Sequence, residues 1–404
     1  MARLRVPRPA TFAAAAATAL FLLGSAPVAV AEPSELLPAS RLLPIPQGAI
    51  HSLAKGLNSS GTVIGEYYVE GSDGPLAIRW NAGRPGYTRL APLSGEKYSR
   101  ATALSDAGWV IGLSYDALPA FHPVRWTPGG TPTRLALPGG SRGGNASAVN
   151  NAGVAVGDAY EEDYRSHPLR WRSDGSRTDL PVLPGDSSGT ATSINNAGTV
   201  VGWTEQRDGA GGPAHPVRWN AAGVVSALPL PAGFVGARTS QITDNGVVLG
   251  HGRLAGSTEY DRVLVWAADG TVRDAGRGRG YDVNRAATAV GASLQDSPNG
   301  DPARWNANGT RTVLANPAEA AGEALAINNR GTAVGYAWPP VGNAALDKAL
   351  LWKPDGTVVP LPPSPLGPYG SASAINDAGV IAGVAVGTDG AGNATTWRAT
   401  VWKR

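Results

Sequence analysis

Asparagine recurs at a fixed place in this sequence, and its amide could donate hydrogen bonds to a ligand. It follows Ile or Val and precedes a Gly-containing turn in four similar segments, which contain Asn150, Asn195, Asn328 and Asn376. The same residue at equivalent places points instead to the making of turns, because Asn tolerates turn conformations and bonds its own backbone. We therefore predict a structural role for these asparagines.

Three histidines, His122, His167 and His215, each precede a proline in consecutive segments. Imidazole is a common zinc ligand, but zinc needs its ligands to converge at about 2.0–2.1 Å. Equivalent positions of neighbouring repeats lie roughly 10 Å apart when sheets pack face to face. We therefore predict no metal site and no cofactor.

Aromatic rings beside carboxylates stand in segments that differ from one repeat to the next. A fixed scaffold that carries variable loops on one face is a common way to build a binding surface, and such side chains suit sugars or peptides. The predicted ligand-binding residues are Tyr67, Tyr68, Tyr115, Tyr160, Glu161, Glu162, Asp163, Tyr164, Trp203, Tyr336 and Trp338. The alternative is that these rings fold onto the sheets and the acids only keep the loops soluble.

Catalytic motifs are not evident in the sequence. The acidic run 161–163 lacks the spacing of a calcium loop, and no G-x-S-x-G, H-E-x-x-H or P-loop occurs. A glycan hydrolase needs two carboxylates at a defined separation, which spacing along the chain does not establish. We predict a non-enzymatic module that binds a carbohydrate, peptide or protein. A glycan or glycopeptide hydrolase or lyase, and a structural cell-surface component, are the alternatives.

Two markers recur together, the first at intervals of 41 to 48 residues and the second at intervals of 39 to 50, which indicates eight repeats of about 46 residues. One marker is the glycine that closes each Asn segment: Gly65, Gly112, Gly157, Gly202, Gly250, Gly291, Gly335 and Gly383. The other is a tryptophan: Trp80, Trp126, Trp171, Trp219, Trp266, Trp305, Trp352 and Trp402. The sixth repeat departs most, since Ala287 stands where the others have a turn glycine.

Each repeat predicts four short strands, which is the size of a propeller blade. Residues 40–48 read as a fourth strand with no repeat before it, and the segment ending at 404 reads as a third strand with none after it. Pairing the two would close a ring and cover its edges. We predict an all-β propeller of eight four-stranded blades, with seven blades as the alternative. The tryptophans would pack between blades, and the arginines before them would point outward.

The motifs resemble those of the HAF-repeat family, a group of bacterial β-repeat proteins expected to be extracellular. They are HPVRW at 122–126 and 215–219, HPLRW at 167–171, LALPGG at 135–140 and SINNAGTVVG at 193–202. The resemblance covers almost all of residues 32–404 and departs where the family has His-Ala-Phe. It implies an exported β-repeat protein and no particular activity.

Residues 1–31 have the features of a secretory signal peptide. Arg3, Arg5 and Arg8 precede a short apolar run, and Ala29-Val30-Ala31 suits cleavage before Glu32. This predicts a secreted protein of the general secretory route, with one propeller domain over 32–404 and no membrane span after cleavage. The chain has 34 Lys and Arg and 31 Asp and Glu. Because three of those arginines lie in the signal, the rest is formally neutral, and we predict no nucleic-acid partner.

The sequence contains no cysteine, so disulfides, thiolate metal sites and cysteine nucleophiles are excluded. An exported domain of this kind must be stabilised by burial alone. We expect a monomer.

Overall fold

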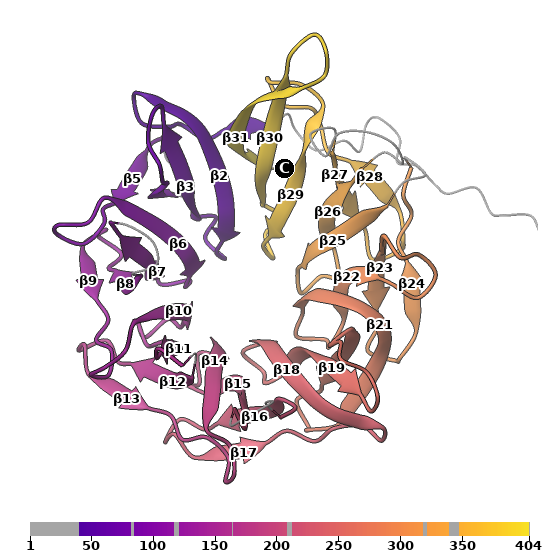
Figure 1. Cartoon of the computed structure of the whole chain (residues 1–404). Helices are drawn as coiled ribbons and strands as arrows, with labels where there is room; N and C mark the ends of the chain where they lie inside the picture. Colours follow the sequence, from indigo (N-terminus) through magenta and orange to yellow (C-terminus); the bar gives the residue numbers. More distant parts are fainter. Residues whose placement is uncertain are drawn as a thin grey trace, which may run out of the picture.

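The computed structural model describes residues 40–81, 85–116, 121–163, 165–207, 212–317, 321–338 and 347–403. Every regular element of these residues is a strand, and the sheets stand around a central opening with their first strands innermost (Figure 1). The fold is therefore an all-β propeller, as predicted. The expected signal peptide and Tyr164 lie outside the described residues. The described residues contain no helix that could span a membrane.

Four-stranded antiparallel sheets make up most of the ring, with strand order following chain order. The first two contain β2 (Ala49–Leu57), β3 (Val63–Val69), β4 (Leu76–Trp80) and β5 (Tyr87–Leu90), then β6 (Tyr98–Leu104), β7 (Val110–Tyr115), β8 (His122–Trp126) and β9 (Pro132–Arg134). The next two contain β10 (Gly143–Val149), β11 (Ala155–Tyr160), β12 (Ser166–Trp171) and β13 (Arg177–Asp179), then β14 (Ser188–Ile194), β15 (Val200–Glu205), β16 (His215–Trp219) and β17 (Val225–Ala227). A later one contains β25 (Gly322–Ile327), β26 (Ala333–Ala337), β27 (Lys348–Trp352) and β28 (Val358–Pro360).

The fifth and sixth repeats form one seven-stranded sheet. It contains β18 (Phe234–Ile242), β19 (Val248–Leu254), β20 (Arg262–Trp266), β21 (Val272–Val283), β22 (Ala289–Ser293), β23 (Asp301–Trp305) and β24 (Arg311–Val313). The first half of β21 pairs with β20 and its second half with β22, so one strand serves both repeats. The count of eight blades or seven depends on how this shared strand is divided, and it stays a prediction.

The ends of the chain close the ring by pairing. β1 (Arg41–Leu42) is the outermost strand of the sheet formed by β29 (Tyr369–Ile375), β30 (Ile381–Thr388) and β31 (Ala394–Trp402). Arg41 is paired with Val401, and Leu43 N donates to Ala399 O at 2.8 Å. This confirms the predicted closure, and it leaves no free edge between the first and last sheets.

The two sequence markers touch each other, which explains why they recur together. Strand one of each repeat has a bulge opposite the closing glycine, as at Ala191/Ser193 opposite Gly202. A Cβ on Gly202 would lie 2.0 Å from Thr190 O and 2.8 Å from the Trp219 ring. No larger residue fits between that carbonyl and the indole.

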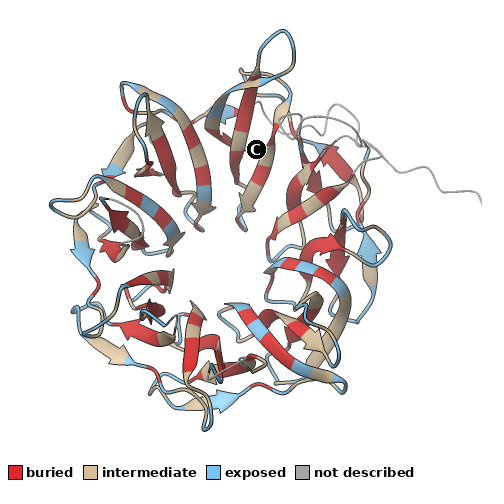
Figure 2. Cartoon of the chain, viewed as in Figure 1, coloured by how far each residue is buried: buried red, intermediate tan, exposed pale blue. Residues whose placement is uncertain are grey.

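The tryptophans of seven repeats are the largest fully buried side chains. They pack between neighbouring sheets, whose strands carry buried residues all around the ring (Figure 2). Trp126 contacts Ile64 and Leu90 of the preceding sheet, in one apolar cluster. Its indole N–H also donates to Ala91 O of the preceding repeat at 2.7 Å, and the tryptophans of six other repeats make the same kind of bond. The exception is Trp305, whose buried N–H has no partner. It follows the shared strand β21, where the separate fourth strand is missing.

The expectation that the arginines before the tryptophans point outward is wrong. Arg79, Arg125, Arg170 and Arg304 are buried. Arg125 donates to Gly153 O, Arg172 O and Ser173 O at 2.8 to 3.0 Å, all in the two turns of the next repeat. A guanidinium carries enough donors to satisfy several turn carbonyls at once, so Arg125, Arg170 and Arg304 tie their sheets to the next ones. Arg79 donates instead to Thr88 of its own sheet, at 3.4 Å.

Candidate functional site

The antiparallel strands give the ring two different ends. The turn between strands one and two and the turn between strands three and four lie at one end, which we call the turn face. The connections between strands two and three, and between successive repeats, lie at the other end, which we call the loop face. The predicted ligand-binding residues belong to the second strands and the connections of the loop face.

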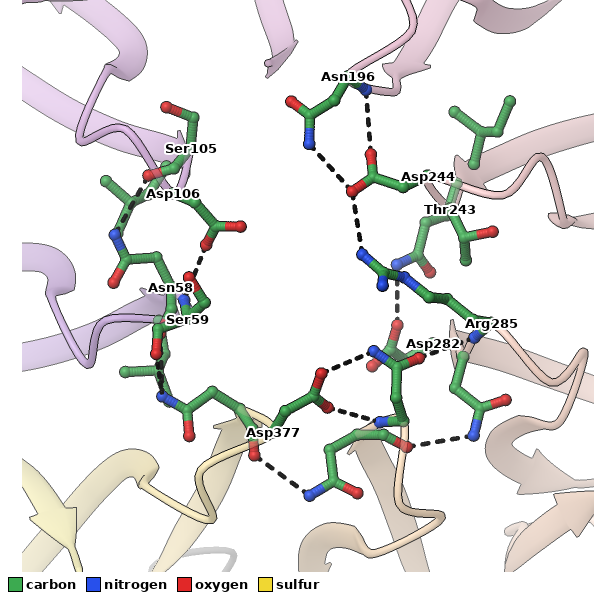
Figure 3. A pocket seen from close by; sticks show the side chains of 18 of the residues that line it. Asn58, Ser59, Ser105, Asp106, Asn196, Thr243, Asp244, Asp282, Arg285 and Asp377 are labelled. Carbon is green, nitrogen blue, oxygen red and sulfur yellow. Dashed lines mark hydrogen bonds and ion pairs between the residues drawn. The ribbon is translucent and has the colours of Figure 1, made fainter. Parts of the chain in front are cut away.

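The central opening forms a cavity of about 440 Å³ at the turn face (Figure 3). It is lined by the last residue of every inner strand and by the polar turn residues that follow. The strand-end residues are Leu57, Leu104, Val149, Ile194, Ile242, Val283, Ile327 and Ile375. The cavity is therefore built from equivalent positions of all eight repeats.

Asn150, Asn328 and Asn376 line this cavity, and these three and Asn195 each bond in two directions. Thr199 N donates to Asn195 Oδ1 at 2.9 Å, which closes the turn of its own repeat. Asn195 Nδ2 donates to Thr243 O at 3.4 Å in the next repeat. Asn376 does the same across the closure, since its Nδ2 lies 3.0 Å from Asn58 O. The predicted turn-making role is confirmed, and a bond between repeats is added to it.

The turn residues that follow the recurring asparagines form further hydrogen bonds between repeats, at the surface of the opening. Ser59 N donates to Asp106 Oδ1 at 2.8 Å, and Ala107 N to Asn151 Oδ1 at 3.1 Å. Further round, Asp244 accepts from Asn196 N at 3.0 Å and pairs with Arg285 at 3.1 Å. When the bonds of the recurring asparagines and those of the following turn residues are taken together, every repeat is hydrogen-bonded to the next around the whole opening. The acids that face the opening are thus committed to neighbouring turns (Figure 3).

A buried acid, Asp282, supports the same ring. It sits at the bulge of β21 and accepts from Gln241 Nε2, Val283 N and Ile327 N at 2.8 to 2.9 Å. Burial raises the pKa of Asp282 to about 6, against the opposing effect of these three donors. It joins the fifth, sixth and seventh repeats, so its role is structural. No three His, Cys, Asp or Glu side chains of the described residues are placed to hold a metal ion.

The loop face holds a separate, apolar pocket of about 270 Å³, lined by His51, Leu53, Tyr68 and Trp397. It lies where the first sheet meets the last, because His51 is on β2 and Trp397 on β31. The two rings meet edge to face, with centroids 4.9 Å apart, and Trp397 N donates to His51 Nδ1 at 3.3 Å. Trp397 remains 36% exposed. A large indole left in contact with water at a pocket is typical of a binding surface.

Charged groups stand beside this pocket. Tyr68 donates its hydroxyl to Glu66 Oε1 at 3.0 Å. Glu66 is itself 5% exposed and lies 3.5 Å from Lys55 Nζ and 3.8 Å from Arg100 Nε. Burial, and then the nearby Glu66 carboxylate, raise the pKa of Tyr68 to about 12, so the phenol stays a hydrogen-bond donor at neutral pH. Of the predicted ligand-binding residues, Tyr68 alone lines this pocket.

A second group of predicted residues gathers at the seventh repeat. Tyr336 and Trp338 have ring centroids 5.5 Å apart, and Tyr336 donates to Glu323 Oε2 at 3.0 Å. Tyr281, from the sixth repeat, donates to Glu323 Oε1 at 2.8 Å. Burial and the Glu323 charge raise the pKa of the nearby Asp347 to about 6, and Asp347 Oδ1 is buried without a hydrogen-bond partner. Two carboxyl groups therefore stand beside partly exposed aromatic rings.

A third group surrounds Trp203, whose ring lies 4.6 Å from the guanidinium of Arg238. Arg238 also contacts Tyr260, and its charge faces Glu205 at 3.5 Å. The fold thus places Trp203, one of the predicted ligand-binding residues, beside the charged side chains of Arg238 and Glu205.

The other predicted residues do not join these groups. Tyr67 and Tyr115 are 4% and 7% exposed, so their rings belong to the core. Glu162 pairs with Arg142 at 2.6 Å, and with Glu161 and Asp163 it lines an open hollow beside Gly140. Tyr160 is partly buried at the end of β11.

The three histidines that precede prolines each pair with one carboxylate, His122 with Glu96, His167 with Glu161 and His215 with Asp186. They are separate ion-pair or hydrogen-bond partners rather than one cluster, in agreement with the sequence-based interpretation.

The sequence analysis missed His51, Trp397, Arg238 and Glu323. One signal was present for Trp397, because it falls outside the regular tryptophan period, only five residues before Trp402. The others lie on inner strands opposite the predicted second strands, as Leu53 lies opposite Glu66 and Glu323 opposite Tyr336. Only the register of the sheets reveals that neighbourhood.

No protein-family model and no curated protein matches this chain. Solved structures of β-propeller proteins do. One from a study of two prolyl endopeptidases has a TM-score of 0.54 at 9% identity, and the match covers 83% of this chain and 54% of that one. An oligogalacturonate lyase in complex with manganese has a TM-score of 0.47 at 11% identity, covering 88% of this chain and 90% of that one. The virginiamycin B lyase of Staphylococcus aureus has a TM-score of 0.39 at 11% identity, covering 90% and 98%. At such identities the likeness concerns the fold alone.

Proposed function

We propose that this chain is an exported, non-enzymatic propeller that binds a glycan at its loop face. The observation that carries the proposal is the pocket of His51, Leu53, Tyr68 and Trp397. Its walls are aromatic, one indole is partly exposed, and Tyr68 and Glu66 supply oriented polar groups. The apolar face of a sugar ring gains free energy when it covers such rings, while its hydroxyls need polar partners at the edge.

Export rests on the sequence of residues 1–31, which has a positive start, an apolar run and a small-residue cleavage site. The absence of cysteine is compatible with this proposal, because the ring is closed by strand pairing and by hydrogen bonds between repeats. Detection of the mature chain in the culture medium, with Glu32 as its first residue, would test export.

Binding is tested with Trp397→Ala and Tyr68→Ala against a panel of neutral and acidic cell-wall glycans, with affinities measured by calorimetry. We expect each variant to bind at least about tenfold more weakly, because the pocket loses a large apolar contact. Trp109→Ala is the matched control, since this partly buried tryptophan packs on the turn face near Arg125. If the parent binds no glycan but selects peptides, the glycan proposal is wrong.

Glycan cleavage is a second candidate function, and it rests on Glu323 and Asp347. The pKa of Asp347 is raised to about 6 while Glu323 accepts from two tyrosines. Acid–base glycan chemistry requires two carboxyl groups, and a raised pKa of one of them suits the role of general acid. Glu323→Gln and Asp347→Asn should then abolish release of products from a bound glycan while leaving its affinity within about threefold. A parent chain that releases no products from any glycan it binds would exclude this candidate.

A further inference from the structure

An arginine–aromatic stack occupies the loop face of the fourth and fifth repeats, away from the Trp397 pocket. The guanidinium of Arg238, on β18, lies 4.6 Å from the Trp203 ring centroid and 4.7 Å from that of Tyr260. Arg253, on β19, lies 5.5 Å from the same Tyr260 centroid. Ala214 N donates to the Tyr260 hydroxyl at 2.8 Å, which holds the ring that both arginines share. The stack is therefore fixed by its neighbours and does not depend on a ligand for its shape.

The charge of this stack is not balanced by its own acids. Glu205 is the carboxylate in contact, and Arg207 at 3.1 Å and Arg238 at 3.5 Å share it. Arg253 forms no ion pair and no hydrogen bond through its side chain within the described part of the chain, and its Nε is buried without a partner. Three guanidinium groups thus face one carboxylate.

Stacking also orients the arginines for recognition. The rings hold the guanidinium groups in place, and the terminal N–H donors of Arg253 bond to no acceptor among the described residues. Those donors match the two oxygens of a carboxylate, and the bond is charge-assisted and directional. The position of Arg253 relative to the closing glycine is held by Tyr68, Tyr115, Tyr160 and Trp338 in four other repeats. In those four repeats an uncharged aromatic ring occupies this position, and only the fifth repeat has an arginine there.

We propose that the stack of Trp203, Arg238, Tyr260 and Arg253 is an anion site that binds a carboxylate group of an acidic glycan. The class of ligand rests on the proposed function, whereas the site itself does not, because it shares no residue with the Trp397 pocket. A uronic-acid sugar provides the planar acid for the guanidinium edges. Its ring would lie over the loop face, beside Trp203.

The test measures the affinity of the full chain for an oligomer of glucuronic acid and for the methyl ester of the same oligomer. We expect the acid form to bind at least about tenfold more tightly than the ester, and more weakly in high salt. Arg253→Gln should remove that preference. Arg253→Lys should restore part of it, since it keeps the charge but loses the planar fork. Arg172→Gln removes an exposed charge on the turn face and should change nothing.

Three results would overturn the anion site. They are equal binding of acid and ester, a preference that survives in Arg253→Gln, and binding of inorganic phosphate or poly-aspartate in place of the glucuronate oligomer. Thermal melting of each variant, expected within a few degrees of the parent, separates lost recognition from lost fold. The Trp397→Ala variant distinguishes the two proposals. If it loses all glycan binding while Arg253→Gln binds acid and ester as the parent does, the pocket is right and the anion site is wrong.

Discussion

The turn face and the loop face are built from the same eight repeats but use their polar groups differently. At the turn face, Asn150, Asn195, Asn328 and Asn376 occupy one position and donate to the next repeat. At the loop face, equivalent positions hold different residues, such as Leu53, Arg238 and Glu323. Contacts between repeats recur in one form at the turn face, whereas the loop face holds groups that differ from repeat to repeat, among them Arg253 Nε and Asp347 Oδ1, which are buried without a hydrogen-bond partner.

This difference shows which residues must be repeated for a physical reason. A ring closes only if each unit meets the next in the same way, so the contacts between units must be alike. The turn face carries those contacts in its asparagines, arginines and tryptophans. The loop face is free of that requirement, so it can vary without opening the ring. Substitutions should therefore cost stability at the turn face and affinity at the loop face.

The largest expected loss of stability is at Asn328. In Asn328→Leu, the N–H of Thr332 and the carbonyl of Asn376 would lose partners that now lie at 3.0 and 3.1 Å. Because Asn328 is 5% exposed, water cannot replace them. We expect unfolding free energy to fall by about 3–5 kcal/mol in urea titrations. The control Asn151→Ala, at the exposed next turn position, should cost less than about 1 kcal/mol. Similar costs at both sites would contradict the role given to the buried amide.

A smaller contrast is expected between two buried tryptophans. Trp126→Phe removes the indole bond to Ala91 O at 2.7 Å, whereas Trp305→Phe removes an N–H that has no partner. Both substitutions replace a buried indole by a phenyl ring, so the difference between their effects on stability reports the hydrogen bond. We expect Trp126→Phe to be more destabilising by about 1–2 kcal/mol. If the two substitutions cost the same in chemical unfolding, the bond between repeats contributes little.

Replacing a buried aspartate by asparagine should have opposite effects on stability at two places, one in each half of the ring. Burial raises the pKa of both Asp158 and Asp282 to about 6. A raised folded-state pKa means that the contribution of each acid is fully present below pH 4 and is lost as pH rises through 6. Asp158→Asn should abolish that loss and stabilise the protein at pH 7 by about 1–2 kcal/mol. Asp282→Asn should instead destabilise it, because both carboxylate oxygens now accept, Oδ1 from Gln241 Nε2 and Val283 N and Oδ2 from Ile327 N, and the new NH2 group would face at least one of these donors. Urea midpoints at pH 4.5 and pH 7 decide this, and equal signs for both variants would refute it.

The sequence predicts the ring well because the ring depends on local turns and on periodicity. The four-strand repeat, the turn asparagines and the pairing of residues near 41 and 401 all follow from repeated short patterns. A merged sixth repeat was considered only in the alternative of seven blades, for which Ala287 and the poor sixth repeat were the signals. Strand four of the fifth repeat and strand one of the sixth are contiguous in β21, and only pairing on both sides reveals it.

The candidate site was predicted only in part, for a physical reason. Trp203, Tyr336 and Trp338 were identified because aromatic residues in variable segments stand out in a sequence. Their partners Arg238, Glu323 and Tyr281 lie on inner strands. Arg238 reaches Trp203, and Tyr281 reaches Glu323, from a neighbouring repeat, whereas Glu323 meets Tyr336 across paired strands of one sheet. Composition does not show which of these side chains will be satisfied by neighbours. Burial does, and it places Tyr67 and Tyr115 in the core.

The smallest expected effect concerns the turn of the sixth repeat. Ala287 has a φ of 58° and is the one described non-glycine residue with a positive φ. Its Cβ costs about 1 kcal/mol in that conformation, so Ala287→Gly should raise the unfolding free energy by up to that amount. Ala286→Gly, at the preceding position without a positive φ, should lower it by about 0.4–1 kcal/mol. Neither variant should change glycan affinity, since both lie at the turn face. A change in affinity would mean that the two ends of the ring are coupled, and the separation of stability from binding would fail.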